Sequence, residues 1–136
     1  MKVAEKSKDE TLFESLKQFY SCPGNTEKLL EILKYKTCLS LRLLDWLSCN
    51  YAKSHNICYS IKIPGTTKYR DFKLYMSYKA MLRSYSKKGF DPFARRDRIY
   101  FSPGGDPDES VQTTVAQINF MRWIIGNNVL DYAHAN

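Results

Sequence analysis

The chain has 136 residues, of which 43% are hydrophobic, and its 21 Lys and Arg against 14 Asp and Glu give a formal net charge of +7. The length suits one folded domain, and the apolar content excludes a disordered chain. No apolar run approaches the roughly 20 residues of a membrane-spanning helix, and the charged N-terminus has no apolar signal segment, so we expect a soluble protein made in the cytosol.

Helical spacing of apolar residues predicts three helices in the first half of the chain. The first is expected at residues 8–20, after a flexible tail at 1–6, and a single domain is expected to span 7–136. The segment "CPGN" ends this helix, because proline cannot continue it. The second and third helices are expected at 26–35 and 40–54, and their apolar stripes would supply much of the core.

Period-two alternation then predicts an antiparallel hairpin. The segment "ICYSIKI" (57–63) alternates Ile and Tyr with Cys, Ser and Lys, which is typical of a strand with one buried face. "PGTTK" forms the turn, and "YRDFKLY" (69–75) returns as the partner strand, with Arg70 and Lys73 facing outward. A third short strand is expected at 98–101.

The segment "SYKAMLRSYSKK" (77–88) changes to helical spacing. Its apolar face would pack on the core, and like charges on another face would repel each other by about a few tenths of a kcal/mol per pair. No acidic side chain of this helix relieves the repulsion, but bound phosphates would. The three bases at i, i+4 and i+8 on this face are Lys79, Arg83 and Lys87.

The last helix is expected to begin near residue 108 or 109 and to end at Gly126. It is apolar on two sides, which is typical of a central helix. A short element is expected at 129–133. The whole pattern predicts an α+β fold in one domain, mostly helical with about five helices, with a small antiparallel sheet of two to three strands.

The net charge is concentrated in one segment, which is the candidate site. The window 68–98 holds ten Lys and Arg and three Asp, so it carries the whole charge of +7 and the rest of the chain sums to zero. Such a segment favours a polyanion, and arginine suits bidentate contacts to phosphate; a solvated basic face without a partner is the alternative. The candidate nucleic-acid-binding residues are Lys79, Arg83, Lys87, Lys88, Arg95, Arg96, Arg98, Arg70 and Lys73.

Several residues near this segment have two interpretations. Phe90 and Phe93 either anchor a turn in the core or stack on exposed bases. Asp97 lies between two arginines and could hold them in an ion pair, and the arginines could instead bind the C-terminal segment through Asp131. Either pairing would leave fewer cations for a partner.

No sequence motif indicates an enzyme. Glycine-rich phosphate loops, G-x-S-x-G and H-E-x-x-H are absent. Asp106 and Asp108 are expected to cap the following helix. We therefore expect no catalytic residue and no cofactor, and an active site assembled only by the fold is the alternative.

The four cysteines form no C-x-x-C pair, and we expect reduced thiols. Cys49, His55 and Cys58 lie close together in the sequence and could begin a zinc site, but a structural zinc ion usually takes four ligands. A fourth ligand would have no recognised spacing, so we expect no bound metal. The candidates for that ligand are Cys22, Cys38 and His134.

Three stretches resemble a known family: "LRLLDWLSCNYAKSHNICY" (41–59), "LYMSYKAMLRSYSKKGFDPFARRDRI" (74–99) and "VQTTVAQINFMRWIIGNNVLDYA" (111–133). They are similar to small basic proteins of nucleocytoplasmic large DNA viruses, such as iridoviruses, marseilleviruses and mimivirus-like viruses. The most specific parts are "YSKK…FDPF.RR.RI" and "TT…QINF.RW". The resemblance implies no activity and no catalytic residue. It implies the host cytoplasm, in a virus factory, as the setting, and the virion as a further one.

We therefore expect a viral, non-enzymatic nucleic-acid-binding protein that docks the phosphates of DNA or RNA with little sequence readout. The alternative is a virion structural or interaction protein whose basic patch binds an acidic protein. Other viral proteins would then be its partners, and exposed aromatic residues would anchor the contact.

Overall fold

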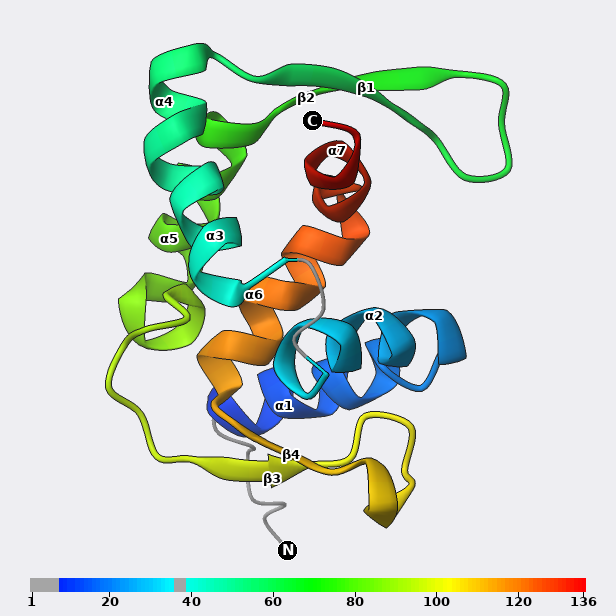
Figure 1. Cartoon of the computed structure of the whole chain (residues 1–136), viewed down its shortest axis with the longest axis vertical. Helices are drawn as coiled ribbons and strands as arrows, with labels where there is room; N and C mark the ends of the chain where they lie inside the picture. The colour runs from blue at the N-terminus through cyan, green and yellow to red at the C-terminus, as the bar shows by residue number, and fades with distance from the viewer. Residues whose placement is uncertain (1–7, 36–38) are drawn as a thin grey trace, which may run out of the picture.

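The computed structural model describes residues 8–35 and 39–136, and it confirms the mostly helical α+β class (Figure 1). The predicted tail at 1–6 lies outside these residues. The helices are α1 (Lys8–Phe19), α2 (Pro23–Leu33), α3 (Leu41–Trp46), α4 (Ala52–His55), α5 (Leu74–Phe90), α6 (Val115–Gly126) and α7 (Val129–Ala135). A π-helical segment, η1 (Leu47–Tyr51), joins α3 to α4, and η2 (Pro107–Glu109) is a 3-10 turn.

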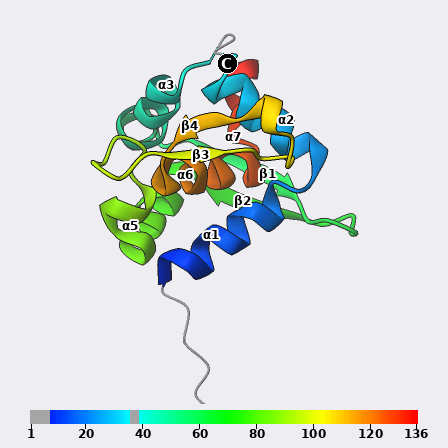
Figure 2. The same cartoon turned by 90° about the horizontal axis from the view of Figure 1, so that it is seen from below.

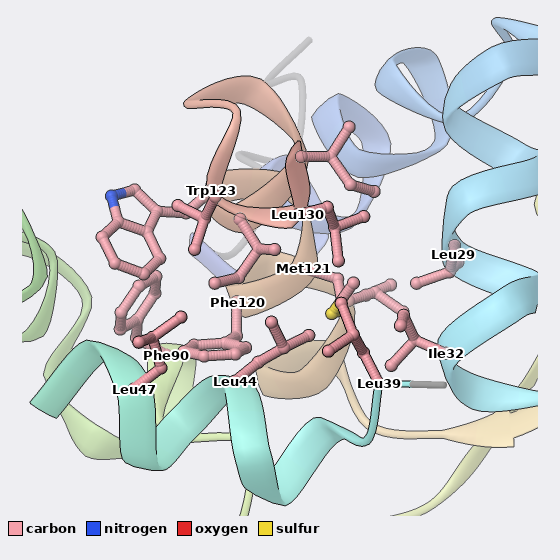
Figure 3. Packing of buried hydrophobic residues seen from close by; sticks show 14 of the residues in the cluster. Leu29, Ile32, Leu39, Leu44, Leu47, Phe90, Phe120, Met121, Trp123 and Leu130 are labelled. Carbon is pink, nitrogen blue, oxygen red and sulfur yellow. The ribbon is translucent and has the colours of Figure 1, made fainter. Parts of the chain in front are cut away.

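α6 is the central helix, as its two apolar stripes predict. Ile118, Phe120 and Met121 are fully buried, and α1, α2, α5 and α7 all pack against this helix (Figures 1 and 2). Figure 3 shows Phe120, Met121 and Trp123 of α6 among side chains from α2, α3, η1 and α5. Burial of each large apolar side chain contributes about 1.5–3 kcal/mol, so α6 organises the core.

Residues 41–55 form one continuous helical rod, close to the predicted helix at 40–54. Ser40 caps it, since its hydroxyl oxygen accepts a hydrogen bond of 3.0 Å from the Leu43 N–H. The rod ends at Asn56, which adopts the left-handed conformation with φ 51°. The preceding α2 begins at Pro23, earlier than predicted, because a proline at the first turn of a helix loses no hydrogen bond.

The strands form two separate two-stranded antiparallel sheets. The predicted hairpin is β1 (Cys58–Lys62) and β2 (Tyr69–Lys73), with Tyr59 opposite Phe72. The predicted third strand is β3 (Ile99–Phe101), but it pairs with β4 (Val111–Thr113) and not with the hairpin.

The sequence pattern did not predict β4, because it assigned the segment before α6 to the helix. The Asp106 carboxylate accepts a hydrogen bond from the Asp108 N–H and caps only the 3-10 turn η2. The helix therefore does not begin at 108 or 109. It begins after Thr114, whose hydroxyl oxygen accepts a hydrogen bond of 3.1 Å from the Gln117 N–H.

α5 contains a break at Ser86, where φ is 62° and ψ is 174°. Only glycine adopts this region without strain. The break ends the regular helical spacing, so the predicted shared face of Lys79, Arg83 and Lys87 is wrong for Lys87, which lies beyond it.

Across the described ranges 8–35 and 39–136, no helix has the length and apolar character needed to cross a bilayer.

Candidate nucleic-acid interface

The nine predicted basic residues lie on three segments. Eight of the side chains are exposed, and Arg96 is half-buried. α5 carries Lys79, Arg83, Lys87 and Lys88, the coil between α5 and β3 carries Arg95, Arg96 and Arg98, and β2 carries Arg70 and Lys73.

Three of these residues line one pocket. Arg83, Lys88 and Arg96 lie around a cavity of about 820 Å³ to which α1 contributes Leu12 and Ser15. A guanidinium N–H of Arg96 donates a hydrogen bond of 2.7 Å to the Lys88 carbonyl, which holds the coil beside the end of α5. We call this cavity the α1–α5 pocket; its remaining lining residues are Thr11, Ser84, Tyr85, Ser86 and Gly89.

A fourth cation, Arg122, lies behind the wall of this pocket. Its guanidinium donates hydrogen bonds to Ser15 Oγ at 2.9 Å, to Asn119 Oδ1 at 3.0 Å and to Tyr85 Oη at 3.4 Å. Ser15 and Tyr85 line the pocket. Within the described residues the side-chain partners of Arg122 are thus neutral, and its half-buried charge adds positive potential to the cavity.

The prediction from sequence missed Arg122. It lies on α6, whose apolar stripes indicated only a core helix. The signal that could have found it is a single arginine in the middle of that apolar helix, since a charge there needs a polar surrounding or a ligand.

Polar side chains of α6 position the coil that carries the arginines. The buried amide of Asn119 donates a hydrogen bond of 2.9 Å to the Gly89 carbonyl, and the amide of Gln117 donates one of 3.1 Å to the Pro92 carbonyl. The Thr113 hydroxyl donates in turn to Gln117 Oε1 at 2.7 Å. The two most specific sequence stretches, around residues 85–99 and 113–123, therefore fold onto each other.

The two phenylalanines of the coil have different roles. Phe90 is fully buried and packs edge-on against Phe120 and Trp123, so its predicted alternative role in base stacking is wrong. Phe93 is 41% exposed, and the Arg42 guanidinium lies 4.5 Å from its ring centroid. Phe93 therefore stays partly exposed, and a base that stacked on the face covered by Arg42 would have to displace this cation–π contact.

The remaining bases do not join the pocket. The Arg70 guanidinium donates a hydrogen bond of 3.0 Å to Asn127 Oδ1, and Lys79 lies 5.6 Å from the Tyr75 ring centroid. Figure 1 places the β1–β2 hairpin, which carries Arg70 and Lys73, at the opposite end of the molecule from the coil with Arg95 and Arg98. The basic segment is therefore divided between two surfaces.

Two carboxylates, Asp97 and Asp131, were the alternatives for pairing with the coil arginines. Asp97 is exposed and has no ion-pair partner in the described part of the chain. Asp131 lies on α7, where its charge, after burial, helps to raise the pKa of Tyr59. Figure 1 places α7 far from the coil between α5 and β3, so the alternative in which Asp131 binds the coil arginines is not realised.

Cys49 and His55 lie on η1 and α4. Burial, with the nearby Asp45 carboxylate, raises the pKa of the Cys49 thiol, which makes it a weaker nucleophile at neutral pH. The His55 and Tyr51 rings stack with their centroids 3.8 Å apart, and His55 Nδ1 lies 3.1 Å from the Tyr51 carbonyl oxygen.

Zinc ligands do not come together in the described residues. There, no three His, Cys, Asp or Glu side chains lie close enough to hold a metal ion. Cys49, His55 and Cys58 therefore form no ligand set with Cys22 or His134. Cys38 lies outside the described residues.

Comparison with known proteins gives a family and a viral relative. A family model described as "Family of unknown function (DUF7197)" matches residues 1–136. The chain is also similar to Uncharacterized protein L507 of Acanthamoeba polyphaga mimivirus, with 34% identity over 107 residues, which cover 76% of this chain. The match spans 40% of the length of that relative. No solved structure matches the chain. The mimivirus relative agrees with the resemblance to proteins of nucleocytoplasmic large DNA viruses.

Proposed function

Because the chain belongs to the DUF7197 family, whose function is unknown, we propose from its own residues that it is a viral, non-enzymatic protein that binds the phosphates of nucleic acid. The observation that carries the proposal is the convergence of Arg83, Lys88 and Arg96 on the α1–α5 pocket, with Arg122 behind it. No Asp or Glu is among the described residues that line this pocket. The charged side chains of the lining are therefore all basic, which favours an anion.

The mechanism is electrostatic docking. Each phosphate that a Lys or Arg neutralises releases condensed counterions, so affinity falls as salt rises. The exposed Arg95 and Arg98 extend the contact from the pocket along the coil. These groups contact phosphate and not base edges, so they position the protein with little sequence readout.

The mimivirus relative supports a viral setting for this activity. We place the protein in the host cytoplasm, in a virus factory, where viral DNA or RNA is abundant, and in the virion as a further location. Detection of the tagged protein on cytoplasmic viral DNA, and in purified particles, tests these two locations separately.

Charge reversal in the pocket tests the proposal. We expect the double variant Arg83→Glu and Lys88→Glu to lose binding to DNA and RNA, because both side chains are exposed and line the pocket. Lys53→Glu, on α4 and exposed, is the matched control that keeps binding. Fluorescence anisotropy with single-stranded and duplex oligonucleotides measures both. Equal affinity of the double variant and the control contradicts the proposal.

A second candidate function is an interaction protein of the virion. Exposed aromatic and apolar side chains favour it: Trp46 is 46% exposed, Leu43 on the same helix is 41% exposed, and Tyr100 on β3 is 79% exposed. Aromatic residues often dominate the binding energy of protein interfaces. A pulldown from infected cells that keeps its partner after nuclease treatment, and loses it in Trp46→Ala, would support this function.

A further inference from the structure

The α1–α5 pocket is a depression that is open to solvent and lined by the exposed Arg83 and Lys88. We infer that it binds a phosphomonoester on a single nucleotide unit, such as the 5′-phosphate end of a single strand or a free mononucleotide. This inference rests on the proposed function, since it specifies which form of phosphate the same residues take.

The shape of the site favours a strand end over a duplex. A cavity of about 820 Å³ falls in the size range of small-molecule sites. A duplex presents its phosphates on a convex surface, so it reaches only the rim of a pocket. A nucleotide at the end of a strand can enter, and Arg83 and Lys88 can then contact its phosphate directly.

The charge of the site favours a monoester over a diester. A phosphomonoester carries a charge of about −1.5 to −2 at neutral pH and three acceptor oxygens, whereas an internal diester carries one negative charge. Arg83, Lys88 and Arg96 line the pocket, and Arg122 contacts its wall through Ser15 and Tyr85. Arg83 and Lys88, the two exposed cations of the lining, supply charge that matches the more highly charged ligand.

The lining also contains groups that suit the rest of a nucleotide. Ser84 and Ser86 are exposed, and within the described residues their hydroxyls have no hydrogen-bond partner, so they can donate to phosphate or sugar oxygens. Leu12 and the ring of Tyr85 provide an apolar wall. A base or a sugar can pack against such a wall without sequence preference.

The break at Ser86 makes this arrangement possible. In an uninterrupted helix, two residues five positions apart point about 140° away from each other. Arg83 and Lys88 would then lie on different faces of α5. With Ser86 at φ 62° and ψ 174°, both side chains line the same pocket. Strained residues of this kind cluster at ligand sites, and here the strained residue lines the site itself.

The test compares two oligonucleotides of one sequence, about 12 nucleotides long, that differ only in a 5′-phosphate or a 5′-hydroxyl and carry a dye at the 3′ end. We expect about tenfold tighter binding of the 5′-phosphate form in fluorescence anisotropy, as one added charge-assisted contact gives. A 5′-mononucleotide should displace it at lower concentration than inorganic phosphate does. If the protein prefers the 5′-phosphate oligonucleotide and the mononucleotide displaces it only weakly, the site binds strand ends. If the mononucleotide displaces it strongly, the site binds free nucleotides as well.

Lys88→Gln and Arg83→Gln, each exposed, should remove the preference for the 5′-phosphate. Lys73→Gln on the hairpin is the control that keeps it. Equal affinity for the 5′-phosphate and 5′-hydroxyl oligonucleotides, with no displacement by the mononucleotide and an unchanged circular dichroism spectrum, overturns the inference. General phosphate binding would then remain as proposed. Mononucleotide binding without binding of either oligonucleotide supports the inference and overturns the proposed function.

Discussion

The buried side-chain amide of Asn119 on α6 donates a hydrogen bond of 2.9 Å to the main-chain carbonyl of Gly89, at the end of α5. Its Oδ1 atom accepts a hydrogen bond from the Arg122 guanidinium at the same time. One fully buried side chain thus holds both the end of the basic helix and the cation behind the pocket. The geometry of the α1–α5 pocket therefore depends on the core.

Replacement of this amide should destabilise the protein. Asn119→Ala leaves the Gly89 carbonyl without its donor and Arg122 with one acceptor fewer, and an unpaired buried polar group costs about 1–3 kcal/mol. We expect the free energy of unfolding in urea to fall by about 3 kcal/mol. Gln112→Ala, exposed on β4, is the control with little effect. A similar small change in both variants would show that Asn119 does not hold these segments.

Removal of the strain at Ser86 should stabilise the protein. Ser86→Gly places glycine where φ is 62° and ψ is 174°, and strain in this region costs about 1–3 kcal/mol. Glycine also loses more entropy on folding, so we expect a net gain of about 1 kcal/mol in urea unfolding. Ser84→Gly, in the regular part of α5, should instead lose about 0.5 kcal/mol. A loss of stability in both variants would contradict the strained conformation at Ser86.

Much of the fold follows from apolar periodicity. The two apolar stripes of α6 predicted a central helix, and the alternation at 57–63 predicted the β1–β2 hairpin, because both patterns extend over several periods. β3 and β4 have three residues each, which is too short for a period to show. The β4 residues were therefore assigned to a helix.

The candidate site was only partly predictable. The concentration of charge at 68–98 is a property of the sequence, and three of its nine candidate residues, Arg83, Lys88 and Arg96, line one pocket in the structure. The break at Ser86 has no Pro or Gly at its own position to announce it, so the helix face that includes Lys87 was wrong. Arg122 enters the site only through contacts with α1 and α5, which no local pattern encodes.

Stability should depend on pH through Asp45. Burial, and then the negative charge of Asp91, raise the pKa of the Asp45 carboxyl above its usual value, while Arg42 opposes this rise. The folded state therefore holds this proton more tightly than the unfolded state. The contribution to stability is fully present below the usual pKa of Asp, and it is lost as pH rises through the raised folded pKa.

Asp45→Asn removes this titration. Urea unfolding at pH 4 and pH 7 gives the free energy of unfolding of the variant minus that of the wild type. We expect this difference to be larger at pH 7 than at pH 4. Asp97→Asn, at an exposed position, is the control for the loss of a carboxylate charge. A gain for Asp45→Asn that is larger at pH 4 than at pH 7 would have the wrong sign for a raised pKa.

The most direct test of the central claim, that the pocket cations bind phosphate, is the salt dependence of single-strand binding in two double variants. Each phosphate contact contributes about 0.7 to the slope of log K against log salt for single strands. We expect Arg83→Gln with Lys88→Gln to reduce that slope by more than about 1, and Arg70→Gln with Lys73→Gln, on the distant hairpin, to change it by less than half as much. Equal slopes for the pocket variant and the wild type would contradict the account.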